Sequence, residues 1–75
     1  MGQEPEKNNA KIDIEEKIVS HFTMIKNLCE DGISITGKKG NSTAADISRA
    51  SQLTDQIFRL NENIRDLLFE LEDTL

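Results

Sequence analysis

An uninterrupted apolar stripe at helical spacing fills the second half of the chain. Its members follow one another at alternating steps of three and four residues, which is the pattern of a helix packed lengthwise on another helix. Neither Gly nor Pro occurs between Thr43 and Leu75, so we expect one long helix there, of about 48 Å at 1.5 Å per residue. The stripe consists of Ala50, Leu53, Ile57, Leu60, Ile64, Leu67 and Leu71.

The start of this helix has a clear signal. Thr43 and Asp46 have the spacing of a capping box, in which the side chains of the first and fourth residues bond each other's backbone N–H groups. We therefore predict a helix over about residues 43–75.

A shorter apolar stripe precedes it, formed by Ile14, Ile18, Phe22, Ile25 and Leu28. Asp13 and Glu16 have capping-box spacing, and Gly32 suits the left-handed residue that follows a helix. These signals predict a first helix over about residues 13–31.

The remaining segments are polar or rich in glycine. Residues 1–11 contain Gly2, Pro5 and mostly polar side chains, which is typical of a disordered tail. Residues 32–42 contain three glycines and two lysines and are expected to form a flexible connection.

The two stripes predict an all-α fold, an antiparallel helical hairpin over residues 12–75 with a short first helix and a long second one. A hairpin of this size has almost no closed interior. Its seam is expected to contain Ile14, Ile18, Phe22, Ile25, Leu28, Ala50, Leu53, Ile57 and Leu60.

The difference in length leaves the end of the second helix without cover from the first. Phe58 and Phe69 lie off the seam, so this end is apolar on more than one side. We expect the hairpin to complete a bundle or coiled coil with a partner. The expected partner interface is Ile64, Leu67, Leu68, Phe69, Leu71, Leu75 and Phe58.

The charge balance argues against several classes of partner. The net charge is -5, whereas binding to nucleic acid or to an anionic membrane surface depends on an excess of Lys and Arg. We expect no nucleic-acid or membrane partner. Without an apolar leader, and with Cys29 as the lone cysteine, we expect an intracellular protein, cytoplasmic or nuclear, that is not secreted by a classical signal peptide.

No residue pattern supports catalysis or a bound cofactor. His21 is the only histidine and Cys29 the only cysteine, which is too few for a metal-ligand set. The Gly37–Thr43 segment has the residue types of a phosphate loop, but their order is different. We expect no enzymatic activity, no cofactor, no metal and no small-molecule substrate.

Three segments resemble the subunit-22 family of the Mediator complex, over about residues 12–72. Ser20-His-Phe-Thr-Met-Ile-Lys-Asn27 is similar to its first-helix segment. Ser48-Arg-Ala-Ser-Gln-Leu53 and Leu60-Asn-Glu-Asn-Ile-Arg-Asp-Leu67 are similar to the start and continuation of its second helix. The resemblance implies a nuclear scaffold subunit whose hairpin pairs with a sister hairpin in a four-helix bundle, without catalytic residues.

The expected function is that of a non-catalytic protein–protein interaction subunit in a multi-helix complex, such as a scaffold subunit of a transcription coactivator. Two alternatives fit the same features. One is a small acidic helical chaperone or co-chaperone, for example of a secretion system. The other is a homodimeric four-helix bundle. The partner is then either another helical protein or a second copy of this chain.

Overall fold

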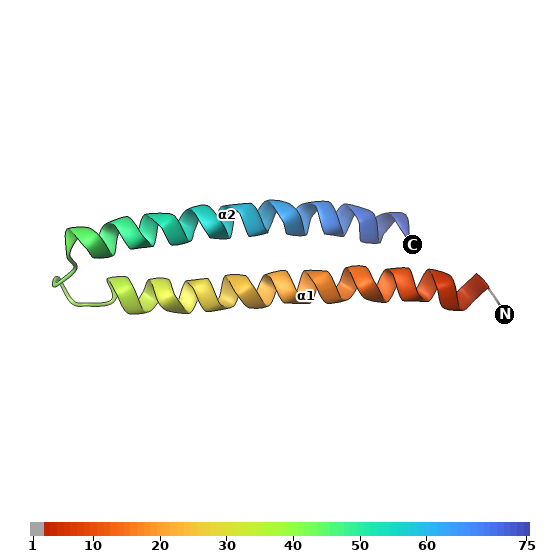
Figure 1. The fold of residues 1–75 in the computed structure, drawn as a ribbon, viewed down its shortest axis with the longest axis horizontal. Coiled ribbons are helices and arrows are strands. Elements are labelled where there is room, and N and C mark those ends of the chain that lie inside the picture. The colour runs from red at the N-terminus through yellow and green to blue at the C-terminus, as the bar shows by residue number, and fades with distance from the viewer. Residues whose placement is uncertain (1–2) are drawn as a thin grey trace.

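Two long helices form most of the structure. The computed structural model describes residues 3–75, in which α1 spans Gln3–Thr36 and α2 spans Ala44–Asp73. The helices lie side by side and run in opposite directions (Figure 1). The molecule is 61 Å long and only 15 and 13 Å across. Among the described residues no strand is present, so the predicted all-α helical hairpin is confirmed.

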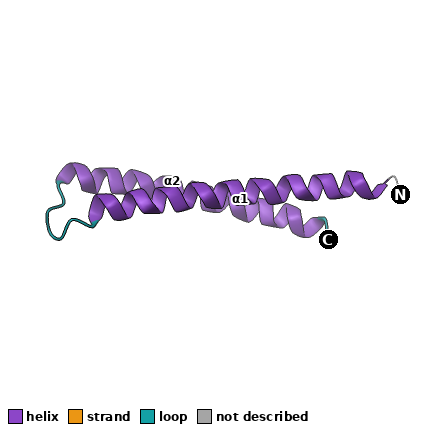
Figure 2. Cartoon of the chain, turned by 90° about the horizontal axis from the view of Figure 1, so that it is seen from below, coloured by secondary structure: helices purple, strands orange, loops and turns teal. Residues whose placement is uncertain are grey.

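A regular seam joins the helices along their length. On each helix, buried or half-buried residues alternate at steps of three and four, and the helices cross at a shallow angle, as in coiled coils (Figure 2). On α1 the seam is Lys11, Ile14, Ile18, His21, Ile25, Leu28, Gly32 and Ile35. On α2 it is Asp46, Ala50, Leu53, Ile57, Leu60, Ile64, Leu67 and Leu71, and Thr74 continues it just after the helix.

The core of the hairpin is small. Ile14, Ile18 and Ile64 form one buried cluster, and Ile64 is the least exposed at 2%. Ile35, near the connection, is the other buried apolar residue of the described side chains. The residues packed against the cluster are Ile25, Leu67 and Leu71.

The prediction of a short first helix is wrong, because α1 continues through Gly32 to Thr36. A glycine inside a helix costs about 1 kcal/mol relative to alanine. Burial of one Ile side chain contributes about 1.5–3 kcal/mol. The extra turn brings Ile35 into the seam, where it is buried. The gain from Ile35 therefore exceeds the cost of Gly32, and Gly32 is not the residue that ends the helix.

The first helix also begins earlier than predicted. Of the expected tail, residues 1–2 lie outside the described residues, and residues 3–11 belong to α1. Pro5 falls in the first turn, where a backbone N–H has no partner within the helix, so its missing hydrogen atom costs little. Asp13 is therefore inside the helix and forms an ion pair with Lys17 at 3.3 Å instead of a cap.

The longer first helix reverses the expected overhang. At 1.5 Å per residue, the 34 residues of α1 extend about 51 Å and the 30 residues of α2 about 45 Å. Figure 1 shows the N-terminal end of α1 extending past the C-terminal end of α2. The end of α2 is therefore not left without cover along the seam.

The start of α2 and the turn before it are well defined. The predicted capping box of Thr43 and Asp46 is confirmed, with both reciprocal hydrogen bonds present. The Asn41 N–H donates to the Lys38 carbonyl at 3.0 Å, and the two central residues of this turn, Lys39 and Gly40, have φ values of 51° and 91°. Two positive φ values are typical of a type I′ turn.

Candidate interaction surface

Most residues expected in the seam are found there. Ile14 and Ile18 are buried. The half-buried members are Ile25, Leu28, Ala50, Leu53, Ile57 and Leu60.

Phe22 is the exception, because 53% of its surface is exposed. The seam advances from Ile18 by three residues to His21 and then by four to Ile25. Phe22 is one residue beyond His21, which rotates it by about 100° around a helix of 3.6 residues per turn. Its expected place in the seam is therefore corrected to an outer position beside it.

The residues expected to contact a partner divide into two groups. Ile64, Leu67 and Leu71 belong to the hairpin's own core, because the longer α1 supplies residues opposite them. Phe58, Leu68 and Phe69 are exposed on α2, and Leu75 is exposed beyond its end. Only this second group remains free to meet a partner.

A second apolar stripe runs along the outside of α1. It again follows steps of three and four residues, at positions 12, 15, 19, 22, 26, 29 and 33, so its members share one face of the helix. Glu15 and Lys26 interrupt it. Its apolar members, all exposed, are Ile12, Val19, Phe22, Cys29 and Ile33.

The corresponding face of α2 contains a matching stripe. It occupies the same positions relative to the seam, at 47, 51, 54, 58, 61, 65, 68 and 72. Ile47, Phe58 and Leu68 are its exposed apolar members, with exposed fractions of 61%, 61% and 47%. We call the two stripes together the apolar flank: Ile12, Val19, Phe22, Cys29 and Ile33 of α1 with Ile47, Phe58 and Leu68 of α2.

The opposite side of the seam shows that the two stripes share one side of the hairpin. A shallow groove there is lined by residues of both helices, namely Met24, Asn27, Leu28, Gln56, Arg59 and Leu60. A second groove joins Lys17 and His21 of α1 to Asn63, Asp66, Leu67 and Glu70 of α2. Apart from Ala10, Met24 and Ala45, the outward residues of this side are polar. Since these positions of both helices face one side, the two apolar stripes face the other.

The charge of the apolar flank differs from that of the whole chain. The charged residues that occur with its members in the two stripes are Glu15 and Lys26 on α1 and Arg65 and Glu72 on α2. Two acidic and two basic side chains sum to zero, whereas the whole chain has a net charge of -5. The excess negative charge therefore lies elsewhere on the surface. Burial of the flank consequently has a lower desolvation cost than burial of the rest of the surface.

The register of the hairpin brings the three apolar residues of the α2 stripe level with three of the five in the α1 stripe. Ile14 and Ile18 pack with Ile64. Residue 16 of α1 and residue 64 of α2 therefore lie at the same height along the hairpin axis, which we call the same level. Phe22 is six residues beyond this level, and Phe58 is six residues before Ile64. Because the rise per residue is the same in both helices, the two Phe residues lie at about one level. The same count places Ile33 level with Ile47, Ile12 level with Leu68 and Glu15 level with Arg65.

The single histidine and the single cysteine occupy different environments. His21 is half-buried in the seam, and its Nδ1 donates to the Lys17 carbonyl at 2.7 Å. Cys29 is exposed on the apolar flank. Among the described residues, no group of three or more His, Cys, Asp or Glu side chains is arranged to hold a metal ion. In the same part of the chain, no helix is long and apolar enough to cross a membrane.

Comparison with known proteins adds no relative. No protein-family model matches the chain, and no curated protein or solved structure gives a significant match. The resemblance to the subunit-22 family of the Mediator complex therefore stays a prediction.

Proposed function

We propose that this protein is a non-catalytic interaction subunit, a helical hairpin that becomes part of a multi-helix bundle by burying its apolar flank against helices of a partner. The flank spans both helices, and a two-helix face of this kind is the surface that bundle formation covers. The proposal replaces the expected docking region at the end of α2 with a face that extends along most of the hairpin.

The observation that carries this proposal is the contrast between core and flank. Four apolar side chains are buried in the described hairpin, which is a small core for a chain of 75 residues. The apolar flank leaves eight residues exposed along one face. The accessible surface of 5910 Å² also exceeds the roughly 4,700 Å² expected of a compact monomer of this mass. Association that covers the flank would supply the missing core.

A role as a scaffold subunit of a transcription coactivator depends on the three segments that resemble the Mediator subunit-22 family. A location in the cytoplasm or nucleus is supported by Cys29, because an exposed unpaired thiol suits a reducing compartment.

Site-specific photo-crosslinking in cells that express the full chain tests the proposal. A benzophenone amino acid is placed at Phe22 or Phe58 on the apolar flank, and at Met24 or Gln56 on the polar side of the same helices. We expect covalent protein adducts, whether with another protein or with a second copy, from the two flank positions. The two polar positions serve as controls and should give few or none.

A flank without adducts, or equal adducts from both sides of the hairpin, would overturn the proposed docking surface. The four positions lie in the two helices, and the two residues of α1 have similar exposed fractions, 53% for Phe22 and 47% for Met24. A difference in adduct yield between them therefore reports which side of the hairpin is covered and not simply which side chain is accessible.

A further inference from the structure

We infer that the partner of the apolar flank is a second copy of this chain, joined by a two-fold axis parallel to the long axis of the hairpin. This inference rests on the proposed function and names its partner. The result is a four-helix bundle in which α1 of one copy lies on α2 of the other, and both connections are at the same end.

The level pairs across the flank make this arrangement self-complementary. A two-fold rotation about an axis along the hairpin keeps every residue at its own level and exchanges the two sides. Phe22 of one copy then meets Phe58 of the second copy, and Glu15 meets the oppositely charged Arg65. By the same count Ile33 meets Ile47 and Ile12 meets Leu68. Each contact occurs twice, as an interface with two-fold symmetry requires.

The helix directions are also favourable. Within each copy α1 and α2 are antiparallel, and the rotation leaves α1 pointing as before, so it is antiparallel to α2 of the second copy. All four pairs of neighbouring helices are then antiparallel. The dipoles of neighbouring helices therefore point in opposite directions, which is electrostatically favourable.

A two-fold axis across the hairpin is the competing arrangement, with α1 on α1 and the connections at opposite ends. Centred on Phe22, it places Glu15 level with Cys29 and Lys26 level with residue 18 or 19. These charged groups would face apolar or weakly polar side chains, and burial of a charge without a partner is costly. An axis across the hairpin can be shifted until some of the charges match, whereas an axis along the hairpin has no adjustable offset and still pairs Phe22 with Phe58, Ile33 with Ile47 and Glu15 with Arg65. We therefore favour the axis along the hairpin.

The size of the flank is sufficient for a stable dimer. The shared length is set by α2, which extends about 45 Å, and two helices with axes 8–10 Å apart present a face about 20 Å wide. Each copy would then bury about 900 Å², close to the roughly 800 Å² per partner of a standard stable interface.

The first experiment measures the solution mass of the full chain by light scattering after size exclusion, over a range of concentrations. We expect a species of twice 8.5 kDa. Phe22→Glu should return the mass to that of the monomer, while Met24→Glu should leave the dimer intact. These residues have similar exposure and lie on opposite sides of one helix. A wild-type monomer at every concentration, or equal loss from both variants, would overturn the inference.

Distances between spin labels then determine the orientation. The label is attached to the connection through Lys39→Cys, in a chain whose own thiol is removed by Cys29→Ser and whose dimer mass is first checked by light scattering, because Cys29 belongs to the flank. With both connections at one end, the width of a four-helix bundle plus the label arms gives a separation on the order of 30 Å. Connections at opposite ends would be separated by most of the 61 Å length, and that result would overturn the axis along the hairpin.

Charge exchange tests the pairing of Glu15 with Arg65. Glu15→Arg alone and Arg65→Glu alone each place like charges at both symmetric contacts of a homodimer, so each should weaken it. A mixture of the two variants restores opposite charges at both contacts and should form heterodimers in preference. Dimer yields that equal wild type in each variant alone would contradict this pairing.

Failure of this inference differs from failure of the proposed function. Flank-specific adducts with another protein, together with a wild-type monomer in solution, would leave the docking surface in place and remove the second copy as its occupant. Absence of flank adducts would remove both.

Discussion

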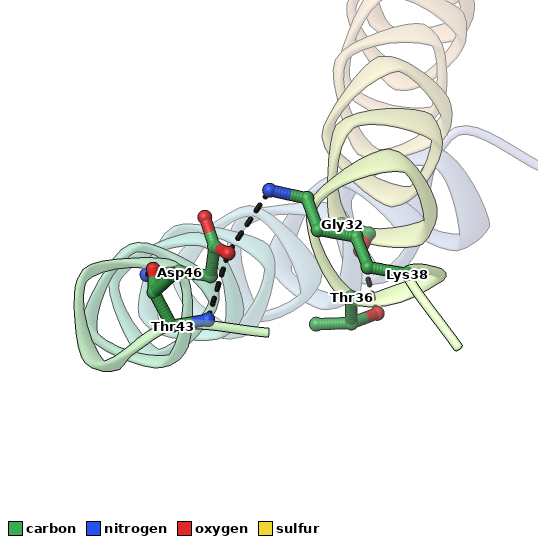
Figure 3. Close-up of polar contacts among 5 residues, drawn as sticks. All are labelled: Gly32, Thr36, Lys38, Thr43 and Asp46. Carbon is green, nitrogen blue, oxygen red and sulfur yellow. Dashed lines mark hydrogen bonds and ion pairs between the residues drawn. The ribbon is translucent and has the colours of Figure 1, made fainter. Parts of the chain in front are cut away.

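The ammonium of Lys38 lies 2.9 Å from Oδ2 of Asp46 and joins the turn to the first turn of α2. The same Oδ2 accepts from the Thr43 N–H at 2.9 Å, and the Asp46 N–H donates to Thr43 Oγ1 at 3.1 Å (Figure 3). On the other side of the connection, Thr36 Oγ1 donates to the Gly32 carbonyl. The Asp46 carboxylate therefore caps α2 and also holds the turn against it.

This relationship predicts a loss of stability in acid. The backbone hydrogen bond from Thr43, followed by the interaction with Lys38, lowers the pKa of Asp46 from 3.8 to about 2. Because the folded-state pKa is below the unfolded value, the contribution of Asp46 is complete above about pH 4. It is lost as the pH falls toward 2. We expect the melting temperature of Asp46→Asn, followed by circular dichroism, to change less than that of wild type over this interval.

A matched control for this prediction is Asp55→Asn, which removes an exposed carboxylate of the same helix outside the cap. It should keep the acid dependence that Asp46 gives to the wild type. Lys38→Met retains the cap and removes the ion pair, so the pKa of Asp46, followed by carboxyl NMR, should rise part of the way toward 3.8. An unchanged pKa would show that the ion pair does not persist in solution.

Two glycines near the end of α1 should respond to alanine in opposite ways. A Cβ at Gly32 would meet no atom within 4 Å, whereas one at Gly37 would lie 2.7 Å from the Ile33 carbonyl oxygen. We expect Gly32→Ala to raise the free energy of unfolding by about 0.5–1 kcal/mol, since alanine loses less chain entropy in a helix. Gly37→Ala should lower it by more than about 1 kcal/mol. Urea denaturation of both variants measures the difference, and equal effects would contradict the described helix end.

The turn contains one residue that is poorly suited to its backbone conformation. Lys39 has a φ of 51°, a region that side chains other than Gly, Asn and Asp adopt at a cost of about 1 kcal/mol. Asn is favoured at such positions in type I′ turns. We expect Lys39→Asn to raise the free energy of unfolding by about 0.5 kcal/mol. Lys39→Val, which is β-branched, should lower it, and identical stability of the two variants would argue against the positive φ.

The seam of α2 was predictable because no glycine or proline breaks its pattern, and the Thr43–Asp46 cap has an explicit signal. The first helix was harder to predict because local signals and packing disagree there. Gly32 has the chemistry of a helix end, yet the burial of Ile35 one turn later outweighs it. No local sequence pattern reports the free energy gained by burying Ile35, because that burial depends on the packing of the whole hairpin.

The misplacement of Phe22 has a different origin. Choosing the aromatic residue over His21 gives steps of four, four and three from Ile14 to Ile25, which breaks the alternation. Strict alternation selects His21, and it leaves Phe22 in a second stripe with Ile12, Val19 and Ile33. The apolar flank was therefore encoded in the spacing. The spacing does not give the register between the two helices, because the levels of the two stripes depend on the residue at which α1 ends.

A last prediction separates the core from the flank by one conservative change at two sites. Ile64 is 2% exposed in the seam and Ile47 is 61% exposed on the apolar flank. Ile64→Val removes a buried methyl group and should lower the free energy of unfolding by about 0.5–1.5 kcal/mol at every protein concentration. Ile47→Val should lower it only at concentrations where the dimer forms, because association stabilises the folded chain by mass action. Urea denaturation at two widely separated concentrations distinguishes the sites. A concentration-independent loss from Ile47→Val would mean that this side chain is packed within its own hairpin.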